Sequence, residues 1–278
     1  MARQRLGQHF LADLAWREEI ARAIRVSPQS IAPSSLAQGR PYCWIEIGAG
    51  HGEMTEHLAG TGTPVYAVEL DRTLITHLQK LTRRYPNLTV ISGDILQIDL
   101  STIVADRRVR IYGNLPYYIT SPILQRLFTF ADLIDEMHFV IQAEVAERLI
   151  AQPGSKAYGY LSILTQFYAR PELVFRIPRG AFRPPPDVGS ALVTLRLPGE
   201  RVTLGQLDAA RFLDFVKLCF SQKRKTLVNS LRSAVDPDRI RETLASLKVR
   251  PDARAEQLSM AMLASLYQHL RPRSQGDR

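Results

Sequence analysis

Cysteine is scarce in this chain. Cys43 and Cys219 are the only two among 278 residues, and both stand among apolar neighbours. Two such thiols predict buried, reduced side chains and exclude a disulfide-stabilised scaffold. No group of Cys and His residues has the spacing of a zinc site, so we expect no metal.

Long apolar runs are also absent. A membrane-spanning helix needs a run of about 18 apolar residues, and the chain has none. The first residues lack the apolar core of a signal peptide. Hydrophobic residues still make up 45% of the chain, which suffices for one large domain and a small one. We therefore expect a cytoplasmic protein that has no membrane partner.

Acidic residues become sparse towards the end of the chain. Residues 201–278 hold 15 Lys and Arg against 8 Asp and Glu, a net of +7, whereas residues 1–200 hold 21 against 19, a net of +2. A basic segment on a nearly neutral body indicates a polyanionic partner. Apolar spacing of three and four over residues 207–270 predicts helices. We expect a main domain over residues 1–200 and a small basic helical domain over residues 201–278.

A glycine-rich turn follows the first predicted strand. Tyr42–Ile47 is an apolar run of strand length, and Gly48-Ala49-Gly50-His51-Gly52 follows it directly. In this arrangement the backbone can approach a nucleotide-like ligand closely. A dinucleotide fingerprint would place glycine at position 53, where Glu53 stands, and an acid in the first turn of a helix repels a pyrophosphate. A cationic donor such as S-adenosylmethionine fits better.

Two acids stand at the ends of the next predicted strands. Glu69 lies about 20 residues beyond the glycines, where a ribose-binding carboxylate is expected. Asp94 could accept a hydrogen bond from an adenine amino group, or it could cap a turn. Strands alternate with helices from Tyr42 to about Ala151, which predicts an α/β fold with a doubly wound, Rossmann-like sheet. Such sheets bind ligands at their strand ends.

The segment Asn114-Leu115-Pro116-Tyr117 ends a further predicted strand. An Asn oxygen can accept hydrogen bonds from an adenine amino group. The residue before a proline is extended, which can turn the Leu115 carbonyl towards the same group. Tyr117 would stack on the base, an interaction worth roughly 1–3 kcal/mol. An ordinary turn is the other interpretation. Together with the acids, the segment predicts an adenine N6-methyltransferase that works mainly by positioning.

These motifs together resemble those of the ribosomal RNA adenine dimethyltransferases, most closely the bacterial small-subunit type. The resemblance runs from Gly7 to about Ser259. It includes Gly7-Gln8-His9-Phe10-Leu11, which in the family lies beside the cofactor, with Asn more usual at the position of His9. It implies an S-adenosylmethionine-dependent methyltransferase domain. The cofactor-binding residues that it implies are His9, Leu11, Gly48, Glu69, Asp94 and Asn114.

Two downstream stretches extend the resemblance. The Pro-rich stretch Phe182–Ser190 resembles a family loop that carries a second target-stacking aromatic residue, so Phe182 is expected on the opposite face of the base. A connector with Phe182 in the core is the other interpretation. Phe220–Leu231 resembles a basic family motif, which implies that Lys223, Arg224 and Lys225 bind RNA. A solvated start of a helix would show the same charges.

The resemblance implies methyl transfer from S-adenosyl-L-methionine to N6 of two adjacent adenosines near the 3′ end of 16S rRNA, each methylated twice. The residues expected at the reacting base are Asn114, Leu115, Pro116, Tyr117 and Phe182. The expected partner of this monomer is 16S rRNA in the small ribosomal subunit or its precursor. Two alternatives stay open: a large-subunit enzyme of the macrolide-resistance type, and a non-catalytic ribosome-assembly factor.

Overall fold

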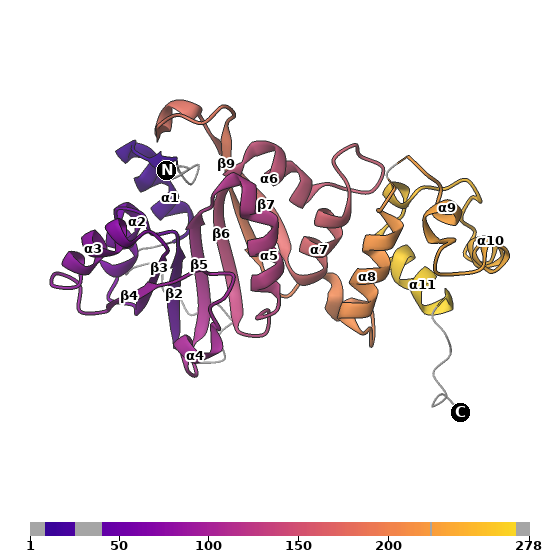
Figure 1. The fold of residues 1–278 in the computed structure, drawn as a ribbon, viewed down its shortest axis with the longest axis horizontal. Coiled ribbons are helices and arrows are strands. Elements are labelled where there is room, and N and C mark those ends of the chain that lie inside the picture. The colour runs from indigo at the N-terminus through magenta and orange to yellow at the C-terminus, as the bar shows by residue number, and fades with distance from the viewer. Residues whose placement is uncertain (1–8, 26–40, 223, 271–278) are drawn as a thin grey trace, which may run out of the picture. The chain divides into compact units, whose positions relative to one another are not determined.

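The computed structural model describes residues 9–25, 41–222 and 224–270, and they fall into two compact units (Figure 1). The first unit comprises the chain up to Ala146 together with Ala169–Pro198, and the second comprises Glu147–Tyr168 together with the chain from Gly199 on. The boundary after Pro198 lies close to the expected division at residue 200, and Glu147–Tyr168 belongs to the second unit in addition.

A seven-stranded sheet forms the centre of the first unit, in the order β4-β3-β2-β5-β6-β9-β7. The strands are β2 Tyr42–Ile47, β3 Val65–Glu69, β4 Leu88–Ser92, β5 Arg108–Asn114, β6 Ile134–Gln142, β7 Arg170–Ile177 and β9 Ser190–Arg196. Strands β2 to β6 are parallel, whereas β9 runs antiparallel to both β6 and β7. The predicted α/β fold class is confirmed, including its Rossmann-like parallel core.

Helices cover both faces of this sheet. The helices α1 Leu14–Ala23, α2 Glu53–Ala59 and α3 Arg72–Leu81 share one core with Trp44. Ile45 points to the other face, since successive strand residues alternate, and it is fully buried as well. Figure 1 shows α5 Thr120–Phe128 on that side of the strands. The short helix α4 Ser101–Val104 precedes β5.

The first helix, α1, begins at Leu14. Asp13 caps it, because its side chain accepts hydrogen bonds from the backbone N–H groups of Ala15 and Trp16. The preceding residues form a two-residue strand, β1 Phe10–Leu11, which pairs antiparallel with β8 Phe182–Arg183. The pairing joins segments far apart in sequence, so local periodicity could not reveal it.

The second unit is helical, as the apolar spacing predicts. Helix α6 Ala143–Ile150 leads into it, followed by α7 Tyr160–Tyr168, α8 Ala209–Cys219, α9 Leu227–Leu231, α10 Pro237–Ser246 and α11 Met260–Leu270. Short 3-10 helices occur at Arg179–Ala181 in the first unit and at Glu200–Thr203 and Ala255–Gln257 in the second.

Contacts within the second unit explain why Glu147–Tyr168 belongs to it. The Phe212 ring lies 5.5 Å from the Phe167 ring. The loop before α7 is fixed as well, because the Tyr158 hydroxyl donates to the Leu258 carbonyl at 3.1 Å. The Gly154 N–H donates to the Glu256 carbonyl at 2.7 Å.

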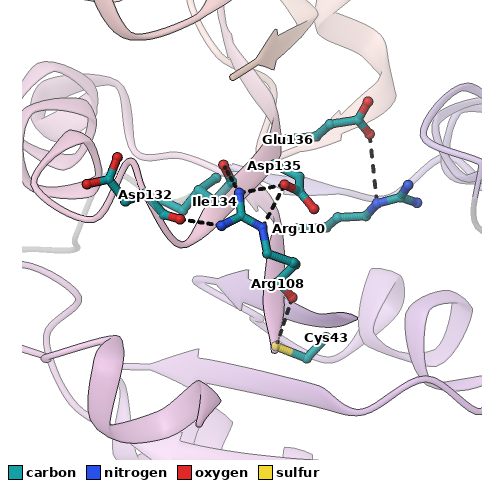
Figure 2. Close-up of polar contacts among 7 residues, drawn as sticks. All are labelled: Cys43, Arg108, Arg110, Asp132, Ile134, Asp135 and Glu136. Atoms are coloured by element: carbon teal, nitrogen blue, oxygen red, sulfur yellow. Dashed lines mark hydrogen bonds and ion pairs between the residues drawn. The ribbon is translucent and has the colours of Figure 1, made fainter. Parts of the chain in front are cut away.

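An arginine-centred cluster joins the amino ends of β5 and β6 (Figure 2). The Arg108 guanidinium donates to the Asp135 carboxylate at 2.6 Å and to the Ile134 carbonyl at 3.3 Å, and it also donates to the carbonyl of Asp132. Beside it, Arg110 lies 3.9 Å from the Glu136 carboxylate. These contacts anchor the strand that ends at Asn114.

Both cysteines are free and buried, as predicted. Burial raises the pKa of the Cys43 thiol to about 11 and that of the Cys219 thiol to about 12. Within residues 9–25, 41–222 and 224–270, no helix has the length and apolar character to cross a membrane. The same residues contain no group of three or more His, Cys, Asp or Glu that could hold a metal ion.

Candidate functional site

The glycine turn adopts the conformation that its residues predict. Gly48 has a φ of +68° and Gly52 a φ of +92°, values that a side chain makes costly. A Cβ on Gly52 would lie 2.5 Å from the Leu81 side chain, so this glycine is needed for packing of α3. A Cβ on Gly48 would meet nothing within 4 Å, because that residue faces open space.

Two adjoining cavities occupy this space at the carboxyl ends of the strands. The first is lined by His9, Phe10, Gly48, Gly50, Glu69, Asn114, Leu115, Pro116 and Tyr117. The second is lined by Ile47, Gly48, Val68, Glu69, Leu70, Gly93, Asp94, Ile95, Pro116, Tyr118, Ile119 and Ile123. The turn, both predicted acids and the Asn114 segment are therefore brought together.

Glu69 lines both cavities. One carboxylate oxygen accepts from the Gly50 N–H at 2.9 Å, and the other accepts from the N–H groups of Leu70 and Asp71 at 2.8 and 3.0 Å. A carboxylate has about four acceptor sites, so these three bonds leave capacity for a ligand hydroxyl. The bonds also fix the side chain, which is 3% exposed.

The second cavity combines apolar walls with one acid. Asp94 Oδ1 accepts from the Leu96 N–H at 3.0 Å, so the turn-capping interpretation is correct for this oxygen. Its other oxygen has no donor among the residues that the structure describes. Ile95 lines the same cavity. A flat ring with an amino donor on its edge matches these walls and this acceptor.

Asn114 lies at the end of β5 with its amide orientation fixed. Its Nδ2 donates to the His9 carbonyl at 2.8 Å. Since a carbonyl only accepts, the amide nitrogen must occupy this position, which leaves Oδ1 as a free acceptor at the cavity. The Leu115 N–H donates to the Val140 carbonyl at 3.0 Å, so the backbone next to Asn114 is anchored to β6.

Tyr117 begins the 3-10 helix Tyr117–Ile119, directly after Pro116. Its hydroxyl shares a 2.7 Å hydrogen bond with Ser190 Oγ on β9. Burial raises the pKa of Tyr117, and the Ser190 hydrogen bond only partly offsets this, so the phenol stays neutral. The ring stacks on the His9 imidazole with centroids 5.6 Å apart and an interplanar angle of 29°.

Two predicted site residues lie outside both cavities. Phe182 is 0% exposed and belongs to the hydrophobic core, so its ring lines neither cavity in this structure. Leu11 is in the same core, and its carbonyl accepts from Arg17 Nε at 2.7 Å. The β1–β8 pair explains both positions, because its side chains serve to hold the amino-terminal segment on the body.

The predicted RNA-binding residues lie in the second unit. Lys223 is outside the described residues. Arg224 and Lys225 are exposed in the loop between α8 and α9. Neither forms an ion pair with any residue that the structure describes.

Sequence reasoning missed two walls of the second cavity. Tyr118 is 63% exposed and Leu70 is 54% exposed, which is unusual for large apolar side chains. An aromatic residue directly after the Asn114–Tyr117 segment was the available signal for Tyr118. Leu70 carried no signal, since one apolar residue after a strand is common.

Glu46 lies behind the glycine turn and is almost fully buried. The Thr55 hydroxyl donates to its carboxyl group at 2.5 Å. Burial raises the pKa of Glu46 to about 8, the Thr55 hydrogen bond lowers it, and the charges of Glu53 and Glu69 add to the rise. Glu46 thus supplies less negative charge at neutral pH than its residue type suggests.

Comparison with known proteins gives a consistent result. Residues 1–271 match the family described as ribosomal RNA adenine dimethylase. The chain is 39% identical over 280 residues to a Koribacter versatilis protein named ribosomal RNA small subunit methyltransferase A, covering 96% of this chain and 94% of that protein. It is 40% identical over 260 residues to a protein of the same name from Xanthomonas oryzae pv. oryzae, covering 94% and 93%.

Two solved structures resemble the whole fold. A dimethyladenosine transferase from Plasmodium falciparum has a TM-score of 0.72 at 22% identity, covering 94% of this chain and 96% of that one. The 23S rRNA methyltransferase ErmE has a TM-score of 0.66 at 25% identity, covering 94% and 99%. At 22% identity, the similarity to the Plasmodium falciparum structure shows a shared fold and nothing more.

Proposed function

Because the chain belongs to the ribosomal RNA adenine dimethylase family, we propose that it transfers methyl groups from S-adenosylmethionine to N6 of two adjacent adenosines near the 3′ end of 16S rRNA. Each adenosine receives two methyl groups. The observation that carries the proposal is the orientation of Asn114, whose amide oxygen is left free by the hydrogen bond to the His9 carbonyl. The substrate is the small ribosomal subunit or its precursor in the cytoplasm.

The residues present fit S-adenosylmethionine. Open space over Gly48 accommodates a ligand where the two cavities meet. Glu69 has acceptor capacity for ribose hydroxyls at that junction, and the apolar second cavity with Asp94 suits the adenine ring. The first cavity would then hold the methionyl end. When bound, the cofactor supplies an electrophilic methyl group, so the protein has only to position the nucleophile.

The chain's own groups orient the target amine. N6 of adenine is a weak nucleophile because its lone pair is delocalised into the ring. Asn114 Oδ1 and the Leu115 carbonyl would accept hydrogen bonds from its two N–H groups and favour a more tetrahedral nitrogen. Tyr117 would stack on the flipped base. Its hydroxyl bond to Ser190 keeps the ring from turning away.

Replacement of Asn114 tests this assignment. Asn114→Ala should lower methyl transfer about 30- to 800-fold, because it removes one orienting hydrogen bond and weakens the neighbouring one from Leu115, each worth on the order of 1–2 kcal/mol. Binding of S-adenosylmethionine, measured by calorimetry, should change only a few-fold. Equal loss of binding and transfer would instead make Asn114 a donor-site residue. The matched control is Asn87→Ala, since Asn87 uses its amide for carbonyls of Ala59 and Thr63, away from the cavities.

One comparison favours a second candidate, methylation of large-subunit rRNA. The ErmE structure covers 94% of this chain. The small-subunit relatives are more similar in sequence, at 39 and 40% identity. We therefore place the small-subunit substrate first.

A further inference from the structure

Two exposed arginines lie beside the first cavity, on the segment of residues 178–189 that joins β7 to β9. Arg183 is opposite Phe10 in the β1–β8 pair, and Phe10 lines that cavity. Arg179 stands four residues earlier in the same segment. Neither side chain forms an ion pair with any residue that the structure describes, and Asp187 is the one acid of the segment. Two positive charges therefore face solvent beside the proposed base site.

The segment is fixed against residues that surround this cavity. The Nδ1 atom of His9 lies 2.9 Å from the Pro184 carbonyl. Directly after the segment, Ser190 Oγ shares a 2.7 Å hydrogen bond with the Tyr117 hydroxyl. His9 and Tyr117 both line the first cavity. The segment is thus held at two points, and its arginines stay close to any ligand that enters there.

Backbone carbonyl groups of the segment hold both guanidinium groups in place. Arg179 Nε donates to the Pro186 carbonyl at 2.6 Å. Arg183 Nη1 donates to the carbonyls of Gly180 and Phe182, each at 3.0 Å. These acceptors are neutral, so the positive charges persist. A guanidinium has five N–H donors, so several stay available to a ligand. Side chains that are ordered before binding lose less entropy when a ligand binds.

We propose that Arg179 and Arg183 form a phosphate-binding surface that holds the RNA backbone beside the flipped target base. The inference rests on the proposed function and deepens it. A nucleotide whose base enters the first cavity leaves the adjoining phosphates at the entrance. Arginine binds phosphate through a planar fork, which fixes orientation as well as supplying charge. Phosphate contacts position a nucleic acid without reading its sequence. The two arginines therefore place the target strand, and the cavity selects the adenine.

The salt dependence of RNA binding tests this surface. A fragment of small-subunit rRNA that contains the target adenosines is titrated with the full chain at several KCl concentrations. Arg179→Ala/Arg183→Ala should bind about tenfold more weakly at low salt, and the slope of log affinity against log salt should fall by about 1 for each lost phosphate contact. In methyl transfer to unmodified small subunits, KM should rise about tenfold while kcat stays within a few-fold. Cofactor affinity and Tm should stay near wild type.

Two further variants separate phosphate binding from net charge. Arg22→Ala/Arg84→Ala removes the same charge from two exposed arginines of the same unit, each of which has a carboxylate partner. It should change the slope less. Arg179→Lys/Arg183→Lys keeps the charge and gives up the planar fork, so it should keep most of the slope while KM rises.

The proposal is overturned if Arg179→Ala/Arg183→Ala keeps the wild-type slope and KM, or if its slope changes no more than that of Arg22→Ala/Arg84→Ala. It is equally overturned if RNA binding, cofactor affinity and Tm fall together, because the arginines then serve only to hold the segment. Failure of the proposed function looks different: wild type itself would transfer no methyl group to rRNA.

Discussion

At the residue scale, the sequence predicted which side chains lie together at the carboxyl ends of the strands. It did not predict the contacts that each of them forms. Gly48, Glu69, Asp94 and Asn114 follow successive strands, and parallel strands bring their carboxyl ends to one edge of the sheet. Their meeting was therefore predictable. The contact between His9 and Pro184 was not predictable, because it depends on the pairing of two short distant strands. The burial of Phe182 was one of two interpretations that the sequence left open. The protonation of Glu46 was equally hidden, since it follows from burial.

Glu46 should make stability depend on pH. Its pKa is about 8 in the folded protein, above the unfolded value near 4.5, so folding favours the protonated form. The contribution is fully present below about pH 4.5 and is lost as the pH rises to about 8. Glu46→Gln should therefore raise the free energy of unfolding at pH 8.5 by as much as about 4 kcal/mol, with little gain at pH 4.5.

Denaturant unfolding of the cofactor-free protein at both pH values measures this effect. Glu56→Gln is the control, because that side chain is 44% exposed. A gain for Glu46→Gln that is the same at both pH values would mean that the carboxyl is ionised in the folded protein.

Tyr118 should contribute to cofactor affinity. Its ring is 63% exposed at the second cavity, so a bound adenine would remove apolar surface from water. Burial of about 50 Å² is worth roughly 1.3 kcal/mol, and Tyr118→Ala should weaken S-adenosylmethionine binding about five- to tenfold. Tyr118→Phe should bind as wild type does. Calorimetry measures the affinity, and Val202→Ala is the control, because Val202 is also an exposed apolar residue. Unchanged affinity in Tyr118→Ala would show that the ring does not contact the cofactor.

At the scale of elements, periodicity and turn chemistry predicted most of the sheet. The strand at Tyr42–Ile47 is where the pattern places it, because an apolar run bounded by turn residues carries a local signal. The segment before α1 carries no such signal, since Asp13 caps the helix and Phe10–Leu11 pairs with a distant strand. Long-range pairing of two residues leaves no local pattern.

The Arg108 cluster should stabilise the β5–β6 pair. Arg108→Met removes the partner of a largely buried Asp135 carboxylate and of two carbonyl groups. Loss of a hydrogen-bonded charge in such surroundings should cost about 2–3 kcal/mol of unfolding free energy. Arg211→Met is the control, because its pair with Asp208 is exposed. If thermal unfolding shows the same change in Tm for both variants, the Arg108 cluster contributes no more than an exposed ion pair.

At the scale of the whole molecule, charge separates the two parts of the chain. The net charge of +7 over residues 201–278 follows from composition. Composition does not show which of the basic side chains form ion pairs. Arg241 and Arg250 each have a carboxylate partner, Asp238 and Asp252. Arg224 and Lys225 have none among the described residues, so their charge is available to a polyanion.

Phosphate binding by these two side chains predicts a change in salt dependence. The double variant Arg224→Ala/Lys225→Ala should weaken RNA binding at low salt and reduce the slope of log affinity against log salt by about 1 for each phosphate that is no longer neutralised. The variant Arg241→Ala/Arg250→Ala removes the same charge and should change the slope less. Equal slopes for the two variants would mean that net charge alone attracts the RNA.

Methyl transfer to isolated ribosomal subunits tests the central claim most directly. Labelled S-adenosylmethionine is supplied with small subunits that lack the modification, with large subunits as the control, and the adenosines are then identified by mass analysis. The account predicts N6,N6-dimethyladenosine at two adjacent positions in small-subunit rRNA only. Label in large-subunit rRNA, or specific binding to small subunits without transfer, would contradict it.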